Sequence, residues 1–556
     1  MLSFLKKPWN VWAGAVLSAV LLDLPFPIAG PMPAWRAVFA WFALVPLLCA
    51  LLAESTLEHK RPLRRAFLLG YLSGALWYMI NCYWVYDTIL IHGGLPPVIS
   101  AILFVSIAVV LGLYWGFFGI AVVLVRQRFG SVQIALTSVP FFWTALELLA
   151  SRLTSVPWDQ LGYTQIDNAL LTLLAPWTGV YGITFLLMAG NALIAGGYLL
   201  PCCPQEKKYQ RRVSVLCGVL LMLFGSLGLT AQPSAEATSS TAVLVQPNLD
   251  VAAENVWRGA DWDQHIVALT RMAADPCRSY IAGMPQTEAP VVAKPCASGS
   301  AHPDLVVWPE APAPFFEIDP RFQQAMAGVA GASRASLVIG GIGISPPLSG
   351  EPYERSYNSA MVFAANGNEL GRQDKIHLVP FGEYIPFKDL LPFAHKLAGR
   401  VAEFTPGESR KIFVLGGHHY GIFICYEAVF ADEVRHLAAE GADVFVNISD
   451  DGWYGDTSAP WQHLNMARMR AIENHRWILR DTNNGATVAI DPRGQVTQSI
   501  DRHTVDALPA AYGFHQDVTF YTAHGDLFAR IILLVAMLLM VAGLFPELRL
   551  KISRKS

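Results

Sequence analysis

Residues 98–125 read VISAILFVSIAVVLGLYWGFFGIAVVLV, a run in which no side chain is charged. A helix of about 20 residues crosses the ~30 Å hydrocarbon core of a bilayer, so this run is long enough to span one. Comparable apolar windows lie near residues 9–30, 35–53, 66–90, 132–150, 173–200, 213–230 and 527–546. The sequence therefore predicts eight membrane spans, seven before residue 231 and one near the end.

The composition agrees with a membrane protein and excludes other classes. Of the 556 residues, 53% are hydrophobic and 15% are charged, which is unusual for a soluble enzyme and excludes a disordered chain. A formal net charge of −3 provides no positive field for a phosphate backbone, so no nucleic-acid partner is expected. Eight cysteines are too few for a disulfide scaffold.

The positions of the cations predict the orientation of the spans, because short cytoplasmic loops collect Lys and Arg. If eight spans alternate, all the cation clusters fall on one side of the membrane. These clusters are Lys6–Lys7, Lys60–Arg65, Arg126–Arg128, Lys207–Arg212 and Arg549–Lys555. We therefore predict that both termini are cytoplasmic and that the long segment between the seventh and eighth spans is exported.

This pattern divides the chain into three parts. Residues 1–230 form a transmembrane domain of seven helices, residues 231–526 an exported domain, and residues 527–556 the eighth helix with a short cytoplasmic tail. In the exported part, short strand-like runs such as Leu305–Trp308 and Val444–Ile448 alternate with helical patterns such as His463–His475. Such alternation predicts an α/β domain with its own core.

Three residues of the exported part could carry chemistry. Glu310 ends the run Asp304–Glu310, Cys425 ends the run Tyr420–Cys425, and Lys375 lies in a loop bounded by Gly and Pro. Ligands of open α/β sheets bind beyond the carboxyl ends of strands, where two of these side chains are expected. Taken singly, each also has an ordinary structural explanation, since buried thiols pack as small hydrophobic groups and loop lysines are solvated.

The order of these residues and their surroundings resemble the apolipoprotein N-acyltransferases, integral membrane members of the nitrilase superfamily. The matching stretches are Trp308-Pro309-Glu310, the loop from Lys375 to Pro386, Cys425-Tyr426-Glu427, Asp451–Asp456, Gln462–Ala471, Thr482–Gly485, Leu161–Tyr163 and Gly179–Gly182. The resemblance implies a nitrilase-like αββα sandwich for the exported domain. It also implies a Glu-Lys-Cys triad that uses neither a cofactor nor a metal.

The resemblance assigns a role to each residue of the triad. Cys425 is the expected nucleophile, Glu310 the general base, and Lys375 a donor to the oxyanion, together with the backbone N–H after Cys425. The supporting residues are expected to be Glu383, which would orient Lys375, and Tyr426 and Glu427. Trp257 and Trp453 match aromatic positions that the family uses near the substrate, although aromatic side chains at such positions also serve packing.

The resemblance further implies the substrates and the compartment. The donor is a membrane phospholipid, and the acceptor is the free α-amine of the diacylglyceryl-cysteine at the N-terminus of an apolipoprotein. The acyl chain would pass through a thioester on Cys425 in the last step of lipoprotein maturation. The chain would lie in the bacterial inner membrane, with its catalytic domain on the periplasmic side.

Two other functions are alternatives to this one. A membrane-tethered nitrilase-like amidase would use the same triad with water as acceptor, so that only the surroundings of Cys425 distinguish it from a transferase. A transferase must exclude water and open toward lipid, whereas a hydrolase needs a cup that water can enter. A transporter would need broken spans and paired charges in the membrane, which the sequence does not suggest.

Several further residues complete the expectations from the sequence. Residues 276–302 read as an insertion, and the oxidising compartment predicts a disulfide between Cys277 and Cys296. Among carboxylates in or near apolar spans, Asp23 and Asp87 can lie at the headgroup level, so Glu147 alone stays a candidate for a function beside a structural role. Asp450, Asp451, Asp456 and the scattered histidines, among them His463, lack the spacing of a metal site, so no metal is expected.

Overall fold

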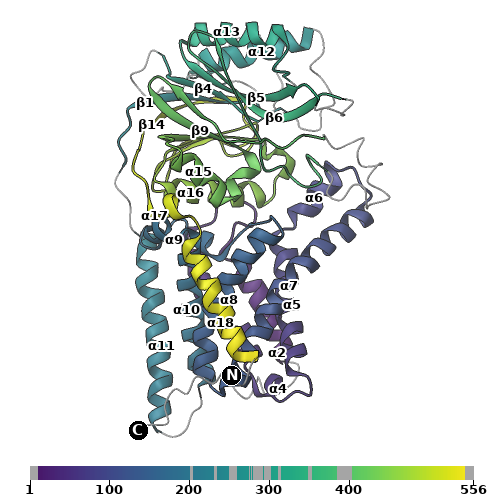
Figure 1. Ribbon diagram of the computed structural model, residues 1–556, viewed down its shortest axis with the longest axis vertical. Coiled ribbons are helices and arrows are strands. Elements are labelled where there is room, and N and C mark those ends of the chain that lie inside the picture. Colours follow the sequence, from purple (N-terminus) through teal and green to yellow (C-terminus); the bar gives the residue numbers. More distant parts are fainter. Residues whose placement is uncertain are drawn as a thin grey trace.

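Two six-stranded β-sheets lie at one end of the molecule (Figure 1). The computed structural model describes residues 10–200, 205–230, 235–249, 260–274, 276, 278–279, 292–293, 302–310, 315–347, 353–384 and 403–544. The strand order is β14-β1-β4-β5-β6-β7 in the first sheet and β13-β12-β11-β10-β9-β8 in the second. The first sheet consists of β1 (Ser240–Gln246), β4 (Leu305–Trp308), β5 (Ser336–Ser345), β6 (Arg355–Phe363), β7 (Glu369–Asp374) and β14 (Asp506–Tyr512). The second consists of β8 (Ile412–Leu415), β9 (His418–Ile424), β10 (Val444–Ser449), β11 (Ile478–Thr482), β12 (Val488–Ile490) and β13 (Val496–Ser499). A separate short pair is formed by β2 (Arg278–Ser279) and β3 (Val292–Ala293).

The middle strands of each sheet are parallel, and their register explains the apolar runs in the sequence. β1, β4 and β5 pair in parallel, as do β9, β10 and β11. Strands that are buried on both faces consist almost entirely of apolar residues, as β4 does with Leu305–Trp308. Parallel pairing brings the carboxyl ends of neighbouring strands to one edge, which is where Glu310 and Cys425 follow their strands.

Helices cover the outer face of each sheet. Alternate residues of β4 point to opposite sides, so Val307 packs between the sheets while Trp308 packs outward. The outer face of the first sheet is covered by α12 (Ala260–Ala274) and α13 (Pro320–Ser333), and that of the second by α15 (Ala431–Ala439) and α16 (Ala459–Asn474). The layers are therefore α, β, β, α, the sandwich that the resemblance predicts (Figure 1).

The remaining helices form a bundle next to α15 and α16 (Figure 1). Its helices are α2 (Asn10–Asp23), η1 (Ala34–Trp41), α3 (Val45–Leu51), α4 (Glu54–Leu57), α5 (Pro62–Asn81), α6 (Trp84–Ile91), α7 (Pro97–Phe129), α8 (Val132–Leu153), η2 (Leu161–Gln165), η3 (Leu171–Leu174), α9 (Ala175–Thr178), α10 (Val180–Leu199), α11 (Gln205–Ser226), η4 (Leu227–Thr230), α17 (Phe520–His524) and α18 (Leu527–Leu544). We call these helices, with the loops that join them within residues 10–230, the membrane bundle. α18, the last described helix, packs against α7 and α8, which are far earlier in the sequence.

Six helical segments among the described residues are long and apolar enough to cross a bilayer. They are Ala34–Leu51, Pro97–Phe129, Val132–Leu153, Val180–Leu199, Arg211–Thr230 and Leu527–Leu544. The first predicted span contains α2, of which 14 residues are described. The second predicted span is interrupted between η1 and α3. The described part of the chain thus has several apolar helices of membrane-spanning length, and the number eight stays a prediction.

The sandwich contacts the membrane bundle through α16 and through the turn after β9. Tyr426 belongs to the same apolar cluster as the bundle helices, and so do Met466, Met469 and Ile472 of α16. Arg152 at the end of α8 forms ion pairs with Asp432 of α15 and with Asp526, just before α18. The edge of the sandwich that carries Cys425 is therefore the edge that faces the bundle.

Some sequence predictions fall on residues that the structure does not describe. Trp257 lies outside the described residues, as do Cys277 and Cys296. The substrate contact predicted for Trp257 and the predicted disulfide remain predictions.

Candidate active site

Cys425 occupies a sharp turn at the end of a buried strand. β9 ends at Ile424, and the 3₁₀ helix η5 (Cys425–Val429) begins at the next residue. The backbone of Cys425 has φ of 49°, a left-handed conformation that costs a residue with a Cβ about 1–3 kcal/mol. Only 5% of Cys425 is exposed. A strained and buried thiol requires that surrounding groups hold the turn in place.

Lys375 joins two carboxylates from different parts of the domain. Its Nζ lies 2.9 Å from Glu310 Oε1 and 2.8 Å from Glu383 Oε1. The lysine is 1% exposed, so its charge depends on these partners rather than on water. Glu310 follows β4 and Lys375 follows β7, and the structure thus brings together two residues that the sequence separates by 65 positions.

Asn358 of β6 completes this arrangement, and the sequence analysis did not identify it. Its Nδ2 donates to Glu310 Oε1 at 2.7 Å and to Glu383 Oε1 at 2.6 Å. The backbone N–H of Asp450 donates to the other oxygen of Glu310 at 2.9 Å. A signal was present, because Asn is depleted in strand interiors and Asn358 lies within an otherwise β-prone strand.

The charges of the cluster favour an ionised pair. Burial alone would raise the pKa of Glu310, but the Lys375 ammonium and the hydrogen bonds from Lys375 and Asn358 bring it below its usual range. Burial opposes the charge of Lys375, and the two glutamates outweigh burial, so the pKa of Lys375 lies above its usual range. Burial, reinforced by the charge of Glu310, raises the pKa of Asp450 to about 8, so this carboxyl is mostly neutral at pH 7.

The thiol of Cys425 is protonated in this environment. Burial and then the negative charge of Glu310 raise its pKa well above the ordinary value, although Lys375 acts in the opposite direction. The thiol and the Glu310 carboxylate are close enough to shift each other's pKa, the thiol lowering that of Glu310 and Glu310 raising that of the thiol. The resting site therefore pairs a neutral thiol with an ionised carboxylate, an arrangement in which a proton can pass from sulfur to oxygen as the sulfur attacks.

Glu427 connects the nucleophile turn to the Lys375 loop. Its Oε1 accepts the backbone N–H groups of Ile376 at 2.7 Å and His377 at 3.3 Å. Its Oε2 accepts the backbone N–H of Ile424 at 2.7 Å. Both oxygens of one buried carboxylate thus fix the segments on either side of the site.

Replacement of this carboxylate by an amide tests that connection. In Glu427→Gln one oxygen becomes an NH₂ group that faces a backbone N–H, which leaves a buried donor without an acceptor. We expect a loss of about 1–3 kcal/mol in the free energy of unfolding and slower turnover. Thermal unfolding of the detergent-purified protein measures this loss, with exposed Glu440→Gln as the control. Equal unfolding of Glu427→Gln and the parent would contradict the proposed connection.

The two aromatic residues near the site lie toward the membrane bundle. The hydroxyl of Tyr426 donates to the backbone carbonyl of Ser155 at 2.9 Å, and its ring stacks with Trp158. Trp453 is 46% exposed, and its backbone carbonyl accepts a hydrogen bond from Thr88 of α6 at 3.1 Å. Tyr426 therefore anchors the nucleophile turn to the bundle, and the half-exposed Trp453 ring packs edge-on against His92.

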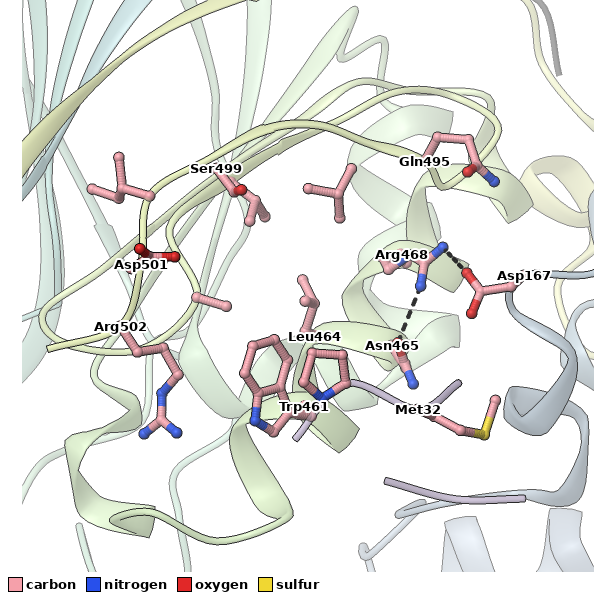
Figure 2. A pocket seen from close by; sticks show the side chains of 15 residues that line it. Met32, Asp167, Trp461, Leu464, Asn465, Arg468, Gln495, Ser499, Asp501 and Arg502 are labelled. Atoms are coloured by element: carbon pink, nitrogen blue, oxygen red, sulfur yellow. Dashed lines mark hydrogen bonds and ion pairs between the residues drawn. The ribbon is translucent and has the colours of Figure 1, made fainter. Parts of the chain in front are cut away.

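A cavity of about 510 Å³ lies beside α16, and Figure 2 shows the side chains that line it. Trp461, Leu464 and Arg468 of that helix line it, and Arg468 bonds Asp167 of the bundle at 2.5 Å. Glu310, Lys375 and Cys425 are not among its lining residues, so we do not assign it to their site.

Glu147, the candidate carboxylate in the apolar spans, accepts hydrogen bonds from Trp143, Leu161 and Thr184, each at 2.9 Å, and so holds the start of η2.

Comparisons with known proteins cover both halves of the chain. The family described as "Apolipoprotein N-acyltransferase N-terminal domain" matches residues 18–193, and the family "Carbon-nitrogen hydrolase" matches residues 244–510. An apolipoprotein N-acyltransferase of Geobacter metallireducens is 33% identical over 519 residues, which cover 93% of this chain and 92% of that protein. A namesake from Chlorobaculum tepidum is 26% identical and covers 96% of each chain. Among solved structures, an amidase from Nesterenkonia sp. is 17% identical, with a TM-score of 0.36 over 54% of this chain and 99% of its own.

Proposed function

Because the chain belongs to the apolipoprotein N-acyltransferases of the nitrilase superfamily, we propose that it transfers an acyl chain from a membrane phospholipid to the α-amine of a diacylglyceryl-cysteine. The reaction runs through a thioester on Cys425. The observation that carries the proposal is the position of the site: Glu310, Lys375 and Cys425 meet at the edge of the sandwich that packs against the membrane bundle.

The first half-reaction forms the thioester. As the sulfur of Cys425 attacks the ester carbonyl of the phospholipid, its proton passes to Glu310, which is ionised in the resting site. The tetrahedral oxyanion is stabilised by Lys375 and by the backbone N–H of Tyr426. The ester C–O bond then breaks, and the leaving alkoxide takes the proton from Glu310, so that a lysophospholipid departs.

The second half-reaction returns the enzyme to its starting state. The amine of the lipoprotein attacks the thioester carbonyl, and Glu310 takes a proton from the attacking nitrogen. The C–S bond breaks, and the sulfur recovers the proton from Glu310. Asn358, which donates to Glu310 and to Glu383, and Glu383, which accepts from Lys375, keep Lys375 and Glu310 in place through both steps.

The surroundings of Cys425 favour transfer over hydrolysis by an amidase. The nucleophile turn is closed by Tyr426, which packs with Trp158 of the bundle, and Cys425 is 5% exposed. A thioester in such an apolar setting is protected from water. The half-exposed ring of Trp453 lies next to α6, where an acceptor arriving along the membrane surface would meet it.

We further propose that residues 231–526 form the catalytic domain and lie on the periplasmic side of the inner membrane. α7 begins beside α6, which contacts the loop of Trp453, and it ends with Arg126 and Arg128. Its 33 residues extend roughly 50 Å at ~1.5 Å per residue, so these cations lie far from the active site. Cations on the side opposite the chemistry support a cytoplasmic location for that end of the bundle.

Transfer and hydrolysis are separated by one experiment on the full chain in lipid nanodiscs. With phospholipid and a synthetic diacylglyceryl-cysteine peptide, we expect the peptide to gain the mass of one acyl chain. The same peptide with an acetylated α-amine is the control and should gain nothing. Fatty acid released at the same rate with and without peptide, while the peptide stays unmodified, would establish the amidase-like hydrolase instead.

A further inference from the structure

A buried polar cluster lies directly behind the nucleophile turn. His463 of α16 is fully buried, and its Nε2 lies 3.0 Å from the backbone carbonyl oxygen of Cys425. Its Nδ1 lies 3.0 Å from Asp451 Oδ1 and 3.1 Å from Arg480 Nη2. Arg480 also bonds both oxygens of Asp451, at 3.0 and 2.9 Å. As single residues, Asp451 and His463 were considered in the sequence analysis only as possible metal ligands. In the fold His463 contacts the Cys425 carbonyl, and Asp451 contacts His463.

The hydrogen bonds determine which ring nitrogen of His463 carries the proton. A carbonyl oxygen only accepts, so Nε2 must donate to Cys425. Burial and the neighbouring Arg480 guanidinium hold the pKa of His463 below its usual range, so the ring is neutral at pH 7. Nδ1 is then unprotonated and accepts from Arg480, and the Asp451 oxygen that lies 3.0 Å from Nδ1 is bonded by the same guanidinium rather than by the ring. The Arg480 and Asp451 charges cancel each other, and the cluster adds no net charge behind the thiol.

The same helix turn is held from the membrane side. Gln462, the neighbour of His463, accepts a hydrogen bond from Trp158 Nε1 at 2.8 Å. Its amide nitrogen donates to the backbone carbonyl of Asn81 at 3.1 Å. Trp158 and Asn81 both belong to the membrane bundle. The position of His463 is therefore fixed by the sandwich on one side and by the bundle on the other.

We propose that His463 is a positioning residue that aims the Tyr426 N–H at the oxyanion by holding the carbonyl of Cys425. The peptide unit between Cys425 and Tyr426 is planar, and in its trans form the C=O and the next N–H point in opposite directions. A donor that fixes the carbonyl on the α16 side thus turns the N–H toward the other side. It also stabilises the left-handed backbone of Cys425, which has φ of 49°. This proposal rests on the proposed role of Cys425 as nucleophile.

The carbonyl stretch of an acyl-enzyme tests the proposal, because a donor to the carbonyl oxygen lowers its frequency. The full chain in detergent is acylated with p-nitrophenyl [1-¹³C]octanoate, and the ¹³C=O infrared band and the burst of nitrophenolate are measured. In His463→Leu we expect a band at higher frequency and acylation slower by roughly 10²-fold, the cost of one misdirected oxyanion donor. His475→Gln, at an exposed histidine that follows the same helix, is the control and should match the parent.

Conservative variants keep the test decisive if His463→Leu does not fold. The amide nitrogen of Gln reaches the place of Nε2, whereas that of Asn does not. His463→Gln should therefore retain the parent band and acylate within about threefold of the parent rate, and His463→Asn should resemble the Leu variant. A purely structural role would change thermal unfolding but leave the band where it is. A parent-like band and burst in His463→Leu or His463→Asn, or a His463→Gln variant as slow as His463→Asn, would overturn the proposal.

This outcome is separable from that of the transfer experiment. The nitrophenyl ester acylates the thiol whether the natural acceptor is an amine or water. Failure to modify the lipopeptide, combined with the expected band shift, would reject the transferase and leave the role of His463 intact. Normal transfer to the lipopeptide without a band shift would leave the transferase intact and reject the role of His463.

Discussion

Cys425→Ser is expected to lose N-acyl transfer by about 10⁴-fold or more. A hydroxyl is far less acidic than a thiol, and Glu310, whose pKa lies below its usual range, is too weak a base to deprotonate it efficiently. The alkoxide is also a poorer leaving group in the second half-reaction. Because Ser and Cys have nearly the same shape, the 5% exposed site should fold unchanged.

The measurement is the rate at which the diacylglyceryl peptide gains an acyl chain, divided by the concentration of folded protein in the nanodiscs. Cys217→Ser is the matched control, since Cys217 is a free and exposed cysteine of α11. The control should retain the parent rate. A Cys425→Ser variant with more than about a tenth of the parent rate would show that this sulfur is not the nucleophile.

Lys375→Met is expected to lower both the rate and the stability. Loss of one oxyanion donor costs roughly 10²–10³ in rate. In addition, Glu310 and Glu383 lose the cation that lies 2.9 and 2.8 Å from them, and an uncompensated buried charge costs about 3–5 kcal/mol. The stability loss should be visible even in protein that is never given a substrate.

The pH dependence identifies the cause of this loss. Without Lys375 the pKa of the buried Glu310 carboxyl rises, so the folded protein of the variant binds protons more readily than the unfolded chain. Its stability relative to the parent should then recover as the pH falls from 8 to 5 and Glu310 is neutralised. Addition of Glu383→Gln to Lys375→Met should restore part of the thermal stability without restoring activity. Lys411→Met, at an exposed lysine, is the control. A stability loss in Lys375→Met that does not change with pH would contradict the buried-charge explanation.

Elements whose structure depends on a local sequence pattern could be predicted from the sequence. The run Leu305–Trp308 is buried on both faces, so its apolar residues predict a central strand, and Glu310, two residues beyond its end, reaches the site. The break between η1 and α3 was not predictable from hydropathy, because residues 34–51 are as apolar as an uninterrupted span. Hydropathy measures the preference for an apolar environment, not the continuity of a helix.

The missed residues of the site are those that tertiary structure brings in. Asn358 reaches Glu310 because β6 lies between β5 and β7, a pairing that no local signal specifies. His463 lies on α16 and Asp451 just after β10, and only the tertiary packing shows that His463 contacts Cys425 and that Asp451 contacts His463. By contrast, Glu310, Lys375 and Cys425 were found because their order and flanking motifs resemble a family.

The central claim is that the acyl chain passes through Cys425, and intact-protein mass spectrometry tests it most directly. The parent in nanodiscs of a single phospholipid, without acceptor, should gain the mass of one acyl chain. The adduct should map to the peptide that contains Cys425 and be released by neutral hydroxylamine, as thioesters are. Adding the diacylglyceryl peptide should discharge it. An unmodified parent that nonetheless acylates the peptide, or an adduct on another residue, would contradict the account.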